Sequence, residues 1–157
     1  MSNAFAQVNY YKGEWTKINS EENFSAFLKL DIKDSIAKGE IIWTFKAIDS
    51  SDDAAVKYYK GQKGKMGIEY VKGIYSYKTH DIQFEGVSKT DPDLIIGLDK
   101  YLLKLSLDKL TIYGRTLSQG ENTGLVYFYK ANNLIAEKEF NSLRSKILSK
   151  SGDKALR

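Results

Sequence analysis

The chain has 157 residues, of which 42% are hydrophobic and 28% charged, so it has enough apolar material for one folded domain and does not have a disordered composition. It carries no cysteine and one histidine, which excludes disulfides and cysteine nucleophiles and argues against a tight zinc or copper site. The formal net charge of +4 is small and the basic residues are spread along the chain, so we do not expect a nucleic-acid partner.

The first twelve residues, 1–12, are interpreted as a lead-in to the folded domain, with Val8, Tyr10 and Tyr11 as an alternative start of the first strand. Within them, Ala4-Phe5-Ala6 has the small-x-small pattern of a signal-peptide cleavage site, while Ser2-Asn3-Ala4 is typical of the remnant of a cleaved tag. No apolar run approaches the roughly 20 residues of a membrane-spanning helix. We therefore expect an exported protein, periplasmic or extracellular, with the cytoplasm as the alternative.

Alternation of apolar and polar residues predicts antiparallel strands through most of the chain. In 24–32, the residues Phe24, Ala26, Leu28, Leu30 and Ile32 share one face, and only Phe27 departs from the pattern. The other predicted strands are 13–18, 40–48, 68–71, 74–77, 81–88, 101–107, 110–116 and 125–130.

Two segments have helical character instead. A serine cap followed by acidic residues predicts a short helix near 52–60, and apolar residues at spacings of three and four predict a C-terminal helix near 134–149. Residues 150–157 are interpreted as a polar tail. The sequence thus predicts a mainly β protein: one domain over 13–149, in which an antiparallel up-and-down meander of about eight strands closes into a barrel.

The Gly13-Glu14-Trp15 motif, the strand count and the final helix together resemble the calycins, the lipocalin-like and avidin-like barrels. The resemblance implies that Trp15 closes one end of the barrel beneath a basic side chain from a late strand, Lys130 or, as the alternative, Arg115. The chain departs from typical lipocalins because Thr90-Asp91 is followed by proline and an extra helix interrupts the strands. Separately, stretches 67–73 and 91–106 resemble parts of uncharacterised bacterial proteins, which implies no activity.

Inward-facing aromatic residues are the candidates for a ligand site, because barrels of about eight strands either hold one small ligand or are filled by side chains. The candidates are Trp43, Phe45, Tyr101 and Tyr127. The leading expectation is a non-enzymatic barrel that binds a small apolar or amphipathic ligand without a cofactor. A purely structural core explains the same residues.

Lysines interleave with tyrosines in the middle of the chain, a composition that suits an anionic partner such as a glycan, a lipid headgroup or a nucleic acid. The residues are Lys57, Tyr58, Lys60, Lys63, Lys65, Lys72 and Tyr75. An interaction module that uses them is the alternative function, and solubilising lysines on edge strands explain the same pattern.

An acid–base hydrolase is the third hypothesis. It would use the carboxylates Asp91, Asp93 and Asp99, with Glu85 across a hairpin, although turn and capping roles also account for them. His80 is interpreted as a solvated turn residue, because the neighbouring Asp81 should point to the opposite face. We therefore assign no catalytic and no metal-binding residue.

Overall fold

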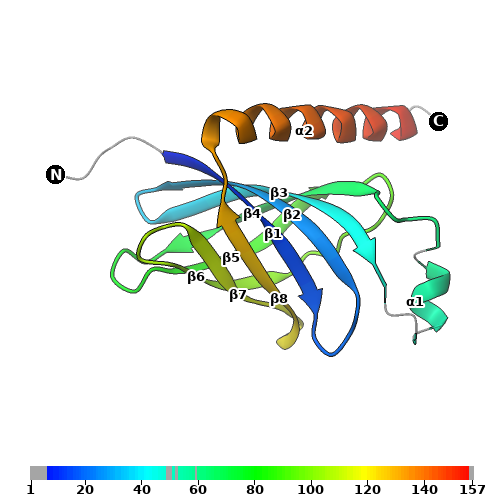
Figure 1. Cartoon of the computed structure of the whole chain (residues 1–157), viewed down its shortest axis with the longest axis horizontal. Coiled ribbons are helices and arrows are strands. Elements are labelled where there is room, and N and C mark those ends of the chain that lie inside the picture. The colour runs from blue at the N-terminus through cyan, green and yellow to red at the C-terminus, as the bar shows by residue number, and fades with distance from the viewer. Residues whose placement is uncertain (1–6, 49–50, 52, 59, 156–157) are drawn as a thin grey trace.

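A computed structural model, which describes residues 7–48, 51, 53–58 and 60–155, shows a closed antiparallel barrel of eight strands in up-and-down order (Figure 1). The predicted fold class is confirmed. The strands are β1 Gln7–Lys17, β2 Asn23–Lys33, β3 Ile36–Ala47, β4 Met66–Tyr75, β5 Asp81–Thr90, β6 Lys100–Leu105, β7 Thr111–Ser118 and β8 Glu121–Lys130. The helices are α1 Asp53–Tyr58, between β3 and β4, and α2 Asn133–Ala155, after β8.

The barrel closes because β1 pairs with β2 on one edge and with β8 on the other. In this register Trp15 lies opposite Phe24 on β2 and Val126 on β8. A side chain at Gly13 would overlap the carbonyl of Tyr127, so glycine lets the two strands approach at this point. Closure leaves no free sheet edge, which removes the unpaired backbone groups that edge strands expose.

Two strands differ from their predicted extents. β1 begins at Gln7, so residues 7–12 are not a lead-in, and the alternative that the first strand includes Val8, Tyr10 and Tyr11 is confirmed. Residues 1–6 lie outside the described residues, together with the proposed cleavage site. The separate strands predicted at 68–71 and 74–77 form the single strand β4. Gly73 does not interrupt it, because its missing side chain makes room for the carbonyl of Gln83 on β5.

The inner core consists of alternate residues of all eight strands. The predicted inner face of β2 is confirmed, with Phe24, Ala26, Leu28 and Leu30 buried in this core. On β3 the same holds for Ile41, Trp43 and Phe45.

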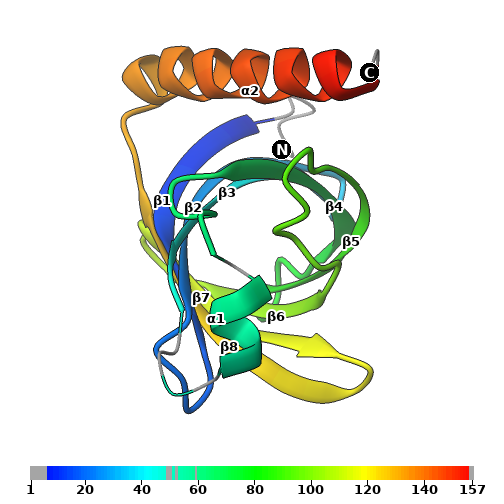
Figure 2. The same ribbon diagram turned by 90° about the vertical axis from the view of Figure 1, so that its right-hand side faces the viewer.

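A second, outer core lies between the barrel wall and α2, which runs across the outside of the barrel (Figures 1 and 2). Phe27 belongs to this core and packs edge-on against Phe140 of α2, which explains its departure from the alternation. Asn132 caps the helix by accepting the amides of Leu134 and Ile135. The helix continues to Ala155, so the tail predicted from 150 is helical over most of its length. Neither described helix has the length and apolar character needed to cross a membrane.

The two ends of the barrel differ in what lies over them. At the α1 end lie the β1–β2 turn, the connection that carries α1, and segment 91–99 between β5 and β6, as Figure 2 shows looking toward α1. At the opposite end lie the β2–β3, β4–β5 and β6–β7 turns.

Candidate functional site

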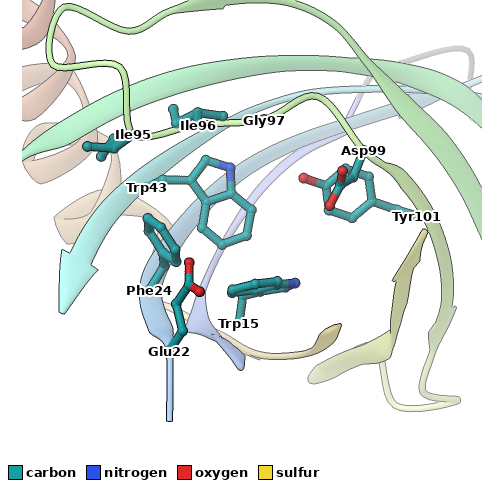
Figure 3. A pocket seen from close by; sticks show the side chains of 9 residues that line it. All are labelled: Trp15, Glu22, Phe24, Trp43, Ile95, Ile96, Gly97, Asp99 and Tyr101. Atoms are coloured by element: carbon teal, nitrogen blue, oxygen red, sulfur yellow. The ribbon is translucent and has the colours of Figure 1, made fainter. Parts of the chain in front are cut away.

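A cavity of about 120 Å³, partly open to solvent, lies in the barrel at the α1 end. Figure 3 shows two indole rings, Trp15 from β1 and Trp43 from β3, facing this space, with the carboxyl groups of Glu22 and Asp99 on different sides of it. The cavity is lined by Trp15, Glu22, Phe24, Trp43, Ile95, Ile96, Gly97, Asp99 and Tyr101. Four of these nine residues are aromatic and two are acids.

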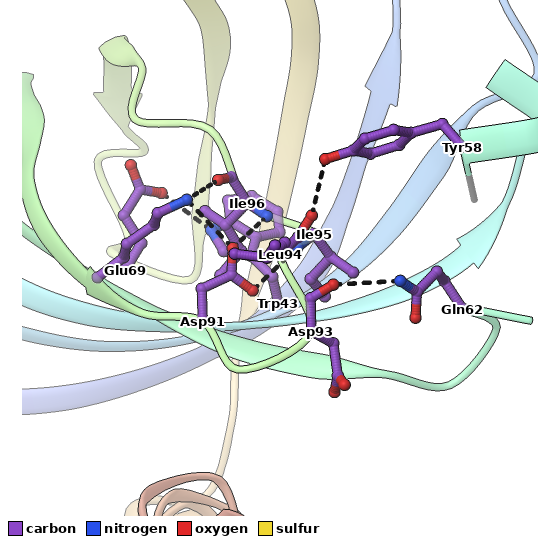
Figure 4. Close-up of polar contacts among 10 residues, drawn as sticks. Trp43, Tyr58, Gln62, Glu69, Asp91, Asp93, Leu94, Ile95 and Ile96 are labelled. Atoms are coloured by element: carbon purple, nitrogen blue, oxygen red, sulfur yellow. Dashed lines mark hydrogen bonds and ion pairs between the residues drawn. The ribbon is translucent and has the colours of Figure 1, made fainter. Parts of the chain in front are cut away.

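Segment 91–99, which we call the closing segment, forms one wall of the cavity. It is held by Asp91, whose carboxylate accepts the backbone amides of Ile95 at 2.9 Å and Ile96 at 2.8 Å (Figure 4). Lys89 donates to the carbonyl of Ile96 at 2.7 Å and to Asp91 at 3.2 Å. These bonds turn Ile95 and Ile96 inward, where both side chains are buried.

Both helical regions also anchor the closing segment. The hydroxyl of Tyr58 on α1 donates to the carbonyl of Leu94, and the amide of Gln62 donates to the carbonyl of Asp93 (Figure 4). Lys150 of α2 forms an ion pair with the Asp93 carboxylate at 2.7 Å. The closing segment is thus fixed from three sides of the molecule although it has no regular secondary structure of its own.

Behind two of the cavity walls lies a fully buried carboxyl group, Glu69 of β4. Its Oε1 accepts the indole N–H of Trp43 at 2.9 Å and the hydroxyl of Tyr101 (Figure 4 shows Glu69 with Trp43). Its Oε2 has no hydrogen-bond partner. Gly86 on β5 makes room for this oxygen, since a side chain there would overlap it.

Burial raises the pKa of Glu69 to about 7, because the charged form loses its hydration in the barrel interior. The hydrogen bonds from Tyr101 and Trp43 lower the pKa, and so does the nearby backbone N–H of Asp99, although it forms no hydrogen bond with Oε2. The negative charge of Asp99 raises the pKa further. Near neutral pH, Glu69 is therefore poised between its neutral and charged forms.

The two carboxyl groups on the cavity walls have different neighbours. Glu22 is buried and forms an ion pair with Lys17, whose ammonium lies 3.5 Å away and is about half exposed. Asp99 is half buried, accepts the hydroxyl of Thr123 at 3.1 Å, and takes part in no ion pair of the described residues. Burial raises the pKa of Asp99, and the bond from Thr123 lowers it.

Comparisons of the chain with protein-family models, curated proteins and solved structures find no match. The resemblance to calycins accordingly stays a prediction.

The structure divides the predicted ligand-binding residues into three groups. Trp43 and Tyr101 line the cavity. Phe45 is buried in the inner core next to Phe24 but is not part of the cavity wall. Tyr127 points to the outside of the barrel, where it packs against Tyr129, so its predicted place in the interior is wrong. It faces outward because it is out of phase with the buried Val126 and Phe128 of the same strand.

The predicted contact between Trp15 and Lys130 is not formed. In the β1–β8 register Lys130 lies opposite Tyr11, near the other end of β1, and its ammonium donates to Asn133 at 2.6 Å. The alternative partner, Arg115, is exposed on the outer face of β7. Trp15 donates its indole N–H to Thr116 at 2.8 Å and forms a wall of the cavity at the α1 end. That it closes this end of the barrel stays a prediction.

The predicted lysine and tyrosine face is only partly brought together: five of its residues share one connection, and Lys72 and Tyr75 lie elsewhere. Lys57 and Tyr58 lie on α1, followed by Lys60, Lys63 and Lys65 in the connection to β4. Lys72 lies on the outside of β4, opposite Glu85. Tyr75 is buried inside the opposite end of the barrel, where its hydroxyl pairs with His80. The five residues between 57 and 65 therefore lie together at the α1 end, whereas Lys72 and Tyr75 do not join them.

The carboxylates of the hydrolase hypothesis do not share a cleft either. Asp91 binds backbone amides, Asp93 pairs with Lys150, and Glu85 is exposed on the outside of β5, so only Asp99 reaches the cavity. No group of three histidine or carboxylate side chains that could hold a metal ion occurs within the described part of the chain.

Two acids of the site, Glu22 and Glu69, were not among the predicted site residues. For Glu69 the sequence carries a signal, because this residue is in phase with the inward-facing Val71 and Tyr75 of β4. Glu22 lies in the β1–β2 turn, and no periodicity marks it as buried.

Proposed function

We propose that this protein is a non-enzymatic binding protein that holds a small amphipathic molecule in the cavity at the α1 end of the barrel. The observation that carries the proposal is the cavity itself, enclosed by the rings of Trp15, Phe24, Trp43 and Tyr101. Pockets that bind small molecules are concave and mainly apolar, with a few convergent polar groups that orient the ligand.

The volume restricts the size of the ligand. A dry apolar cavity of about 150 Å³ in another protein binds benzene, so a cavity of about 120 Å³ accommodates a body of roughly five or six non-hydrogen atoms. The carboxyl groups of Glu22 and Asp99 give the site a polar side. The ligand therefore has a compact apolar body and one polar group, and a long acyl chain does not fit inside.

The two tryptophans of the chain make a direct test available, because both line this one cavity. Indole N–H signals in NMR spectra and intrinsic fluorescence should change together, and saturably, when compounds of this size are titrated. Suitable probes are tert-butanol and tert-butylammonium.

A filling variant provides the control. Ile96→Phe enlarges a wall residue and should weaken every probe that binds, whereas Leu107→Phe, at an exposed position outside the cavity, should leave binding unchanged. If none of the probes perturbs the two indole signals at millimolar concentration, the proposed function is wrong.

A further inference from the structure

The charged side chains of the cavity wall are all negative. Of the nine residues that line it, two are acids and none is lysine, arginine or histidine. Four are aromatic, and the face of an aromatic ring carries partial negative charge. Acidic groups and ring faces thus surround the same small space.

The hydrogen-bond donors of the wall point elsewhere. The indole N–H of Trp15 is used by Thr116, and the donors of Trp43 and Tyr101 are both used by Glu69. The backbone amides of Ile95 and Ile96 are used by Asp91. The side chains of the wall therefore offer acceptors and ring faces, and a ligand must bring its own donors.

Two lysines lie just outside the cavity, but neither of them neutralises the negative charges of both Glu22 and Asp99. Lys17 is half exposed and lies 3.5 Å from one oxygen of Glu22, a long contact for an ion pair. Lys89 is occupied by Asp91 and the carbonyl of Ile96. Asp99 has no cationic partner among the described residues, where its carboxylate accepts one hydrogen bond, from Thr123.

From this arrangement we infer that the ligand is a small organic cation, an alkylammonium whose charge lies between Asp99 and Glu22 and whose carbon body contacts the two indole rings. The inference rests on the proposed function and specifies its ligand class. Cations are attracted to the faces of tryptophan rings, and the attraction grows when water is excluded. An ammonium also supplies donors to carboxylates that accept them, which gives the stronger, charge-assisted type of hydrogen bond.

tert-Butylammonium and tert-butanol have nearly the same shape and size, so a comparison of the two isolates the charge. tert-Butylammonium, tert-butanol and trimethylacetate carry the same tert-butyl body with a positive, neutral or negative group. With the unaltered protein, followed through its two tryptophans, we expect the ammonium to bind at least about tenfold more tightly than the alcohol, and the carboxylate not to bind. Tetramethylammonium, which has no N–H donor, should bind between the ammonium and the alcohol.

Variants in which an acid is replaced by its amide show which carboxylate recognises the ammonium. Asp99→Asn should reduce the preference for the ammonium over the alcohol by about tenfold while the affinity for the alcohol stays the same, since an amide keeps the shape and the acceptor for Thr123. Glu22→Gln should reduce it less, because Lys17 already shares that charge. The matched control is Glu14→Gln, which removes an exposed carboxylate from the outside of β1.

The outcomes separate this inference from the proposed function. Equal binding of alcohol and ammonium, or tighter binding of the alcohol, overturns the cation while the cavity remains a binding site. Binding of none of the probes overturns both. A preference for the ammonium that is unchanged in Asp99→Asn and in Glu22→Gln also overturns the inference, because the charge would then be recognised elsewhere.

Discussion

The two ends of this barrel are built from the same strands, yet one is filled and the other holds a cavity. At the filled end, apolar side chains such as Leu105 and Ile112 occupy the interior, and the hydroxyl of Tyr11 donates to the carbonyl of Lys109. The Tyr75 hydroxyl there pairs with His80 at 2.9 Å. At the α1 end, the indole rings stand apart and Oε2 of Glu69 has no partner.

Under the proposed function, the filled end of the barrel serves stability and the α1 end serves binding. Burial raises the pKa of Tyr11 to about 12, so this side chain stays neutral at every physiological pH and serves the core. Burial raises the pKa of Glu69 to about 7, where protonation changes with conditions. An end that contains an incompletely paired acid and empty space is less stable than a filled one, which is the usual cost of a binding site.

Truncating one isoleucine at each end should give the largest contrast. Ile112→Ala removes a fully buried side chain from the filled end and should cost about 2–5 kcal/mol of unfolding free energy. Ile96→Ala should cost less than half as much, because its side chain already borders a void. Urea unfolding measures both values. Equal losses of unfolding free energy in the two variants would contradict the contrast between the ends.

The pH dependence of stability should come partly from Glu69. Its pKa is raised by folding, so its stabilising contribution is fully present below the unfolded value of about 4.5 and is lost as the pH rises through about 7. The variant Glu69→Gln should therefore remove about 3 kcal/mol of the stability difference between pH 4 and pH 8.5.

Unfolding of this variant and of the unaltered protein should be measured side by side over that range. Glu85→Gln, at an exposed position on β5, serves as the control. A curve for Glu69→Gln that runs parallel to that of the unaltered protein would show that Glu69 does not titrate in this range.

A smaller effect on stability is expected at Gly86, which makes room for the carboxyl group of Glu69. A methyl group at Gly86 would overlap Oε2 of Glu69, so Gly86→Ala should cost about 1–3 kcal/mol. At Gly97 a methyl group meets no atom within 4 Å, so Gly97→Ala should change stability by no more than about 0.5 kcal/mol. Thermal unfolding distinguishes the two variants, and similar melting temperatures would indicate that Glu69 can move freely.

The sequence by itself determined the barrel. Alternation is a local property, and the inner faces of β2 and β3 follow from it because successive side chains of a strand point to opposite sides. The capping and spacing patterns likewise placed both helices, since their causes lie within a few residues of each helix.

Only the tertiary structure decided which end is filled and what covers each face. Phe27 is buried on the outer wall because Phe140, far along the chain, packs on it. Trp15 borders the cavity because the register places it opposite Phe24 and Val126, and Glu69 is buried because Trp43 and Tyr101 converge on it. These relations depend on contacts between distant segments, which a periodic pattern within one strand does not encode.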